Sequence, residues 1–362
     1  MSTNSTTLEE TARQAVSLAR RHGAHEASAT AGRMRELEVQ WRDGRVEKVS
    51  EATTRGLSLQ LYVDGRYSAV STSDLRPEAL DRFISDSVSM TRVLSPDEYR
   101  RLPEPELYAG RAQLELSVED PRQAKLSAEE RQRFARELEE GARSADTKGT
   151  ILSVTTGFGD LSRESYRVSS NGFEGRTCST QFAASAEVSV QDPDGRRPEE
   201  GDSGFTRFFE DLPEASTLGR RAAERALGRI GAVKGASAVL PMAVDRKSAS
   251  RLVSMLFGAM TGAALQQKRS FLEGKLGQKV GSARLSISDD PHLPRGLGSR
   301  LFDGEGIAAR PMPLLEEGVL RTYFIDTYYG RKLGTRPTTG GPSNLSWTLG
   351  TKDRAGLVAD LG

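Results

Sequence analysis

Polar and apolar residues follow two different spacings within the first 93 residues. Small apolar residues recur at helical intervals between residues 12 and 19, which predicts an amphipathic helix. Thr7 can cap this helix, and Glu10 stands three positions later, as in a capping box. A second helix is expected over residues 76–91. Between the two helices the residues alternate, which predicts an antiparallel meander of four strands over residues 36–41, 45–49, 56–63 and 67–71.

Turn signals separate these predicted strands. Asp43-Gly44 and Asp64-Gly65 are pairs of residues that favour tight hairpin turns. Residues 94–126 follow the second helix and are rich in proline and in charged residues. We therefore interpret them as a connecting segment rather than as part of a sheet.

The same order of elements recurs after this segment. Ser127, with Glu130 three positions later, predicts a capped helix that runs through Arg143. Asn171-Gly172 predicts a hairpin turn, and a further helix is expected over residues 215–230. Strand-like runs are found at residues 150–157, 164–169 and 177–190. We interpret this region as a second copy of a helix-plus-sheet unit.

The remaining third of the chain is punctuated by glycine. Residues 238–244 predict a strand, residues 248–265 predict a helix rich in glycine and alanine, and the rest reads as β-rich. We therefore predict an α+β fold with helices packed on antiparallel sheets. Two N-terminal helix-meander units are expected at residues 1–93 and 94–234, followed by a β-rich C-terminal domain at residues 235–362.

Charge and composition exclude two classes of function. Lys and Arg number 51 against 50 Asp and Glu, for a formal net charge of +1, whereas nucleic-acid binding usually needs a basic face. The longest apolar stretch, near residues 252–265, is shorter than the roughly 20 residues that span a bilayer. The single cysteine, Cys178, excludes an internal disulfide and fits a reducing compartment. Because the first seven residues also lack an apolar leader, a cytoplasmic protein with no direct nucleic-acid or membrane partner is expected.

Only three histidines could serve as imidazole ligands. His22 and His25 flank a glycine at a helix end, where an exposed turn is the simpler interpretation. His292 follows Asp289 and Asp290, a set that could bind a hard cation. A solvated turn is favoured there as well, because no second cluster of ligands is visible. No two histidines have zinc-binding spacing, so the chain is not expected to work as a zinc peptidase by itself.

Two further candidates for chemistry have simple structural interpretations. Cys178 lies in a predicted strand, where a small, partly buried core residue is usual, and a nucleophilic cysteine would need a base nearby. The cluster Asp303-Gly304-Glu305-Gly306 predicts a tight acidic turn. The alternative for this cluster is a loop whose backbone approaches a ligand or a partner closely.

Several spaced motifs resemble one protein family. They are the segments 168–173, 269–277, 299–306, 317–320, 328–334 and 338–340. Together they resemble the TldD/PmbA family, and the N-terminal helix and meander fit this family as well, so the resemblance covers nearly the whole chain. It implies two related subunits that assemble into a cytoplasmic peptidase of unfolded or precursor peptides.

The resemblance also implies where a metal would be bound. In the TldD type a His-Glu-x-x-x-His helix binds zinc, whereas the PmbA type, also called TldE, lacks these ligands. Here Phe257, Gly258 and Gly262 stand at the three positions, and neither phenylalanine nor glycine can ligate a metal or transfer a proton. Residues 344–347 resemble the PmbA-type continuation, so the TldE-like subunit is the better match. No catalytic residue, metal or cofactor is expected in this chain, and zinc is expected in the TldD-like partner.

For the loops near this helix, the resemblance implies that residues either line a peptide chamber or hold loop structure. These residues are Arg269, Ser270, Asp303, Glu305, Gly306 and Asn344. Family members continue through a further β-rich portion, so this chain is expected to be truncated. In that case, sheet edges that are normally covered would be exposed.

Three functions remain open at this stage. The first is a non-catalytic subunit that pairs with a TldD-like protein and helps to hold an extended peptide, for example by strand addition to a sheet edge. The second is a stand-alone regulatory or binding protein, similar to a modulator of DNA gyrase and without protease activity. The third is an autonomous hydrolase that uses Cys178 or a site near His292.

Overall fold

The computed structural model describes residues 7–146 and 148–361, and it contains two units with the same order of elements. The first consists of α1 (Leu8–Arg21), β1 (Glu26–Arg42), β2 (Arg45–Val63), β3 (Arg66–Thr72) and α2 (Pro77–Thr91). The second consists of α3 (Ala128–Ser144), β4 (Ile151–Ser169), β5 (Glu174–Val190), β6 (Glu199–Thr206) and α4 (Ala215–Leu227). Short 3-10 helices η1 (Pro105–Tyr108), η2 (Gln123–Lys125) and η3 (Phe209–Asp211) lie in the connections. The order of one helix, three strands and one helix thus occurs twice along the chain.

Local signals in the sequence place the ends of these elements. Thr7 begins α1 with the predicted capping box, and an equivalent box begins α3. Asp43-Gly44 and Asp64-Gly65 form the turns of the first unit, and all four residues have positive φ. This is the backbone conformation that lets two-residue turns follow the twist of paired strands.

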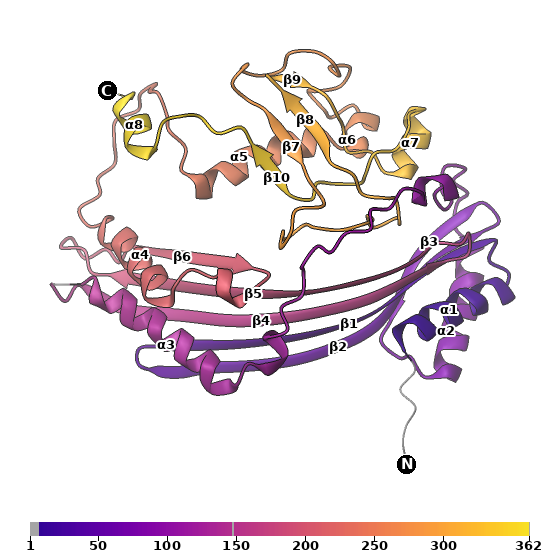
Figure 1. Cartoon of the computed structure of the whole chain (residues 1–362), viewed down its shortest axis with the longest axis horizontal. Coiled ribbons are helices and arrows are strands. Elements are labelled where there is room, and N and C mark those ends of the chain that lie inside the picture. The colour runs from indigo at the N-terminus through magenta and orange to yellow at the C-terminus, as the bar shows by residue number, and fades with distance from the viewer. Residues whose placement is uncertain (1–6, 147, 362) are drawn as a thin grey trace.

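The two units share one six-stranded antiparallel sheet with the order β3-β2-β1-β4-β5-β6. β1 pairs with β4 from Ser28–Ser169 to Arg42–Thr155. The strands of the two units therefore follow in the same order outward from this central antiparallel pair. Figure 1 shows the sheet as long curved strands, with α1 and α2 at one end and α3 and α4 at the other. The sheet is continuous across both units, and the division of the chain after residues 93 and 234 stays a prediction.

The strands are longer and fewer than the alternation predicts. Residues 45–49 and 56–63 belong to the single strand β2, and residues 150–157 and 164–169 belong to the single strand β4. The predicted breaks between these runs are wrong because both strands stay paired with β1 through their polar stretches. The hydrogen bonds of the ladder hold such residues extended whatever their side chains. The alternation also does not predict β6, which begins with two glutamates and a glycine.

Both pairs of helices pack on the same face of the sheet. Along β1, Ala27, Ala29 and Ala31 belong to the core with α1 and α2, whereas Leu37 and Val39 belong to the core with α3 and α4. All five positions are separated by even numbers of residues, so their side chains point to one face of the strand. The opposite face is turned toward the C-terminal third (Figure 1).

The C-terminal third has its own core and a small antiparallel sheet with the order β10-β7-β8-β9. Its elements are α5 (Arg246–Ala259), α6 (Gly262–Gln266), β7 (Ile287–Asp289), β8 (Met312–Glu316), β9 (Val319–Leu320), α7 (Thr327–Leu333), β10 (Leu345–Trp347) and α8 (Arg354–Ala359). Two predictions are wrong here. Residues 238–244, all described by the structure, form no strand, because no other strand pairs with them and their apolar side chains are exposed. The helix expected over residues 248–265 is interrupted between Ala259 and Gly262.

Helices packed on antiparallel sheets confirm the predicted α+β fold. In the part of the chain that the structure describes, no helix is both long enough and apolar enough to cross a membrane.

Candidate functional site

The last turn of α5 carries two of the three positions of the motif. Phe257 is only 9% exposed and lies in the core of the C-terminal third. Its ring centroid is 6.1 Å from that of Phe324, with an angle of 73° between the planes, which is a favourable edge-to-face contact. Gly258 is exposed, with open space where a β-carbon would stand. A side chain at position 257 therefore faces the core, and one at position 258 faces away from it.

The third position of the motif lies beyond the break in the helix. α5 ends at Ala259, and Thr261 begins α6 by accepting a backbone N–H group with its hydroxyl at 3.3 Å. Gly262 donates its N–H to the carbonyl of Phe324 at 2.8 Å. A β-carbon on Gly262 would lie 2.6 Å from the β-carbon of Tyr329, too close in a packed interior. Position 262 therefore has no room for a side chain.

The loop after α6 is attached to the end of α5. The Ser270 hydroxyl donates to the carbonyl of Ala259 at 2.6 Å and accepts the N–H of Leu272 at 3.0 Å. Arg269 is exposed, and its guanidinium contacts the side chain of Gln267. Ser270 therefore holds the loop in place, whereas Arg269 reaches solvent.

Asp303 and Glu305 use their carboxylates to hold neighbouring backbone. Asp303 Oδ1 accepts the N–H groups of Glu305 and Ile307 at 2.9 and 3.0 Å. Glu305 accepts the N–H and the hydroxyl of Thr327, the first residue of α7, at 2.9 and 2.6 Å. Burial raises the pKa of the Glu305 carboxyl above its usual range, although its hydrogen bonds with Thr327 act in the opposite direction. Both acids thus have partners within the chain.

Residues 303–306 pack against the large sheet. Gly306 has a φ of +92°, a conformation that glycine adopts without strain, and a β-carbon there would lie 2.6 Å from the ring of Phe173. From β4, Arg167 donates to the carbonyl of Gly304. The backbone of this turn therefore approaches the sheet of its own chain.

Asn344 ties together two loops beside the small sheet. Its amide group donates to the carbonyl of Asp290 at 2.8 Å and to the hydroxyl of Ser299 at 2.9 Å. Its side-chain oxygen accepts the N–H of Gly298 at 2.9 Å. Asn344 therefore connects the segment after β7 with the segment that leads into β10.

A cluster of aromatic and charged residues joins the C-terminal third to the large sheet. Arg100 lies over the rings of Tyr67 and Tyr328, at 4.7 and 3.6 Å from their centroids. The Tyr328 hydroxyl donates to Asp97 at 2.8 Å. Asp97 and Arg100 were not singled out from the sequence, because the connecting segment has no periodic pattern and the partners of these two residues lie far away along the chain.

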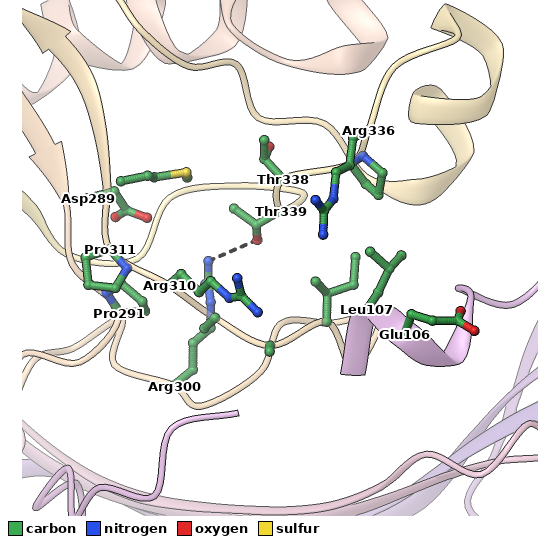
Figure 2. Close-up of a pocket in the computed structure, with 15 residues that line it drawn as sticks. Glu106, Leu107, Asp289, Pro291, Arg300, Arg310, Pro311, Arg336, Thr338 and Thr339 are labelled. Carbon is green, nitrogen blue, oxygen red and sulfur yellow. Dashed lines mark hydrogen bonds between the residues drawn. The ribbon is translucent and has the colours of Figure 1, made fainter. Parts of the chain in front are cut away.

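A pocket of about 280 Å³ opens between η1 and the loops of the small sheet. Figure 2 shows Arg300, Arg310, Arg336, Thr338 and Thr339 around it. The motif segments include Arg300 and both threonines, but no sequence pattern singles out Arg310 or Arg336. Of the candidate site residues named in the sequence analysis, only Asp289 lines the pocket.

Comparison with known proteins identifies the family. Models described as PmbA/TldA metallopeptidase domain 1, central domain and C-terminal domain match residues 29–91, 121–230 and 237–362. The metalloprotease PmbA of Escherichia coli O157:H7 is 30% identical over 94% of this chain and 75% of its own length. The chain belongs to the PmbA/TldD family. A PmbA homologue of Haemophilus influenzae is 28% identical over 99% of this chain and 80% of its own length.

Two solved structures share the fold. A Bacteroides thetaiotaomicron protein, described as a candidate modulator of DNA gyrase, superposes with a TM-score of 0.93 at 36% identity, covering 97% of this chain and 79% of that protein. TldE from Thermococcus kodakarensis superposes with a TM-score of 0.78 at 19% identity, over 97% of this chain and 80% of its own. At this identity the second likeness concerns the fold alone.

The residues at the motif positions do not fit the zinc ion that a PmbA/TldD metallopeptidase motif implies. Phe257, Gly258 and Gly262 offer no ligand atom, and position 262 cannot accept a larger residue. Among residues 7–146 and 148–361, no group of three or more His, Cys, Asp and Glu side chains could hold a metal ion. Near His292, Asp290 accepts the backbone N–H of the histidine at 2.8 Å.

His22 and Cys178, two other candidates for chemistry, each contact neighbouring residues of the fold. His22 Nε2 lies 2.9 Å from Asp81 Oδ1, between α1 and α2. Cys178 on β5 is half-buried, and burial together with a hydrogen bond to Glu119 raises the pKa of its thiol to about 12. Such a thiol keeps its proton at neutral pH, so Cys178 is a poor nucleophile.

Restoring the three motif residues is not expected to create a zinc site. In the triple variant Phe257→His, Gly258→Glu, Gly262→His, residue 257 still faces the core, and Tyr329 leaves no room for an imidazole at position 262 beyond the helix break. Elemental analysis after dialysis should therefore find far less than one zinc per chain. Gly258→Glu alone is the folding control, because its side chain has room. One tightly held zinc per folded triple variant would contradict this account.

Proposed function

We propose that this chain is a non-catalytic PmbA/TldE-type subunit, which assembles with a TldD-like zinc peptidase in the cytoplasm and acts with it on unfolded or precursor peptides. The observation that carries the proposal is the state of the motif positions. Phe257 packs in a core, and Gly262 has no space for a ligand side chain. Under this proposal, the partner supplies the zinc and the catalytic carboxylate.

The names of the relatives support a role in proteolysis. The Escherichia coli and Haemophilus influenzae relatives are named metalloprotease PmbA and its homologue, and one structural neighbour is named TldE. The chain spans 75% and 80% of the length of the two named metalloproteases. The likeness thus extends over most of both proteins.

An edge strand offers a physical means of holding a peptide. β6 lies at one edge of the large sheet, and among the described residues only β5 pairs with it. A peptide that adds to such an edge is bound through backbone hydrogen bonds, while its side chains matter less. This mode suits unfolded substrates of varied sequence.

Mixing the chain with a TldD-like protein should give a stable complex and faster metal-dependent hydrolysis of an unfolded peptide. Size-exclusion chromatography with light scattering measures the complex, and fragment release with and without a chelator measures hydrolysis. The matched control uses a TldD-like protein whose motif glutamate is replaced by glutamine. Hydrolysis by that control mixture would mean that this chain is catalytic. No gain over the TldD-like protein alone would count against a subunit role.

The second candidate is a stand-alone regulatory protein, and it draws on the description of the Bacteroides thetaiotaomicron protein as a candidate modulator of DNA gyrase. A net charge of +1 does not favour direct contact with DNA phosphates. A regulatory protein of this kind would therefore contact a protein rather than the DNA. A cellular effect that persists in the absence of any TldD-like protein would support this candidate.

A further inference from the structure

The pocket between η1 and the small sheet has an uneven distribution of charge. Arg300, Arg310 and Arg336 line it, and Figure 2 shows Arg336 on one side of Thr339 and Arg300 and Arg310 on the other, with Arg300 hydrogen-bonded to Thr339. Within residues 7–146 and 148–361, none of the three arginines forms an ion pair. Guanidinium groups that share a small volume repel one another unless an anion joins them.

Hydrogen bonds hold two of these arginines in place and leave the third free. Arg300 donates to the carbonyls of Gly341 and Pro342 at 2.7 and 3.2 Å, and its buried Nε has no acceptor among the described residues. Arg310 donates to the carbonyl of Ala109 at 3.2 Å. Arg336 is exposed and makes no hydrogen bond with the part of the chain that the structure describes. All N–H donors of Arg336 are therefore available to a ligand.

Two carboxylates belong to the pocket lining, but neither pairs with these arginines. Asp289 Oδ1 accepts the N–H and the hydroxyl of Ser343 at 2.7 and 2.8 Å. Burial raises the pKa of the Asp289 carboxyl above its usual range, although the hydrogen bonds with Ser343 and the charge of Arg300 act in the opposite direction. Glu106 is exposed, and Figure 2 shows its carboxylate pointing away from the pocket. The pocket therefore keeps an excess of positive charge.

The other walls of the pocket are mainly apolar and include Leu107, Ile307, Met312 and Pro337. The volume of about 280 Å³ is close to the lower end of small-molecule sites, at roughly 300 Å³. Guanidinium groups match carboxylates in geometry and can bind them through two parallel hydrogen bonds. The size and the mixed lining suit one or two amino-acid residues that end in a carboxylate.

We infer that this pocket binds a carboxylate joined to a small apolar group, the chemistry found at the C-terminus of a peptide and in simple carboxylic acids. Arg336 and Arg310 bind the carboxylate, and Arg300 positions the Thr339 side of the pocket. The apolar group packs against Leu107 and Ile307. This inference goes beyond the proposed function, because it requires neither a partner subunit nor hydrolysis.

Isothermal titration calorimetry on the full chain tests the inference with three probes. N-acetyl-alanyl-leucine carries the carboxylate, its C-terminal amide lacks the charge, and hexanoate lacks the peptide bond. We expect the acid to bind and the amide to bind far more weakly, with an affinity for the acid that falls as salt is added. Tighter binding of the peptide acid than of hexanoate identifies a peptide C-terminus as the source, and equal binding identifies a simple carboxylic acid. Equal binding of acid and amide, or no binding of either, overturns the inference.

Variants at the pocket give an independent test. Arg336→Gln should weaken binding of the acid by about tenfold or more, because a charge-assisted pair of hydrogen bonds is lost. Arg336 is exposed and makes no internal bond to the described residues, so this variant is expected to fold normally. Arg82→Gln, on the exposed surface of α2, removes the same charge far from the pocket and is the matched control. Unchanged binding by Arg336→Gln, or an equal loss in Arg82→Gln, would overturn the inference.

Discussion

Replacing Asp160 with alanine is expected to lower the free energy of unfolding by about 3–5 kcal/mol, because it leaves the charge of Arg131 buried without a partner. Arg131 on α3 and Asp160 on β4 have side chains that are 3% and 0% exposed. Arg131 Nε lies 2.5 Å from Asp160 Oδ2, and its Nη2 lies 3.1 Å from Oδ1. Gln123 of η2 donates to the same carboxylate at 2.7 Å. This one carboxylate therefore holds together the sheet, a covering helix and the connecting segment.

Urea denaturation followed by circular dichroism measures this loss. The double variant Arg131→Met, Asp160→Leu should recover much of the stability, since apolar residues of similar size can replace a buried ion pair. The matched control is Glu140→Ala on the same helix, where the pair with Arg136 is exposed and spans 3.6 Å. That change should cost less than about 1 kcal/mol. A loss for Asp160→Ala no larger than for the control would refute the role of the buried pair.

The crossing of α3 and α4 should tolerate no β-carbon at Gly219. A β-carbon there would lie 1.9 Å from the carbonyl oxygen of Leu138, and one on Gly141 would lie 2.2 Å from that of Ser216. Alanine normally stabilises a helix relative to glycine by roughly 1 kcal/mol. Here Gly219→Ala should instead destabilise the protein by about 1–3 kcal/mol or more, because the two backbones must move apart.

Thermal and urea unfolding of Gly219→Ala measure whether the substitution lowers the free energy of unfolding, as expected, or raises it. Gly258→Ala is the matched control, since Gly258 also lies in a helix but has open space around a β-carbon. That variant should be neutral or more stable by up to about 1 kcal/mol. If both variants shift stability in the same direction, backbone contact does not explain the glycine at position 219.

Features that depend on neighbouring residues could be predicted, and features that depend on distant ones could not. The capping box at Thr7 and the turn at Asp43-Gly44 involve residues within a few positions of each other. The length of β2 depends instead on its pairing with β1. This pairing continues through the polar stretch where the sequence predicted a break. The apolar residues 238–244 show the reverse case, since a strand-like pattern forms no strand without a neighbour.

The site divides in the same way. The resemblance identified Phe257, Gly258 and Gly262 as positions without ligand atoms. It could not show that Phe257 packs on Phe324, or that Tyr329 closes the space at position 262. No sequence pattern singles out Arg310 or Arg336, because the pocket forms only when separate loops of the C-terminal third meet η1.

The pairing of β1 with β4 has a consequence for synthesis on the ribosome. β1 leaves the ribosome early, but its edge from Ser28 to Arg42 stays unpaired until β4 has been made. Leu37 and Val39 also stay uncovered until then, because the helices that pack on them belong to the second unit. The nascent chain therefore presents an open strand edge and uncovered apolar residues during elongation, the condition under which strands of different chains associate. In fragments of the protein that end before β4, the edge of β1 and these apolar residues stay exposed, so such fragments are prone to associate.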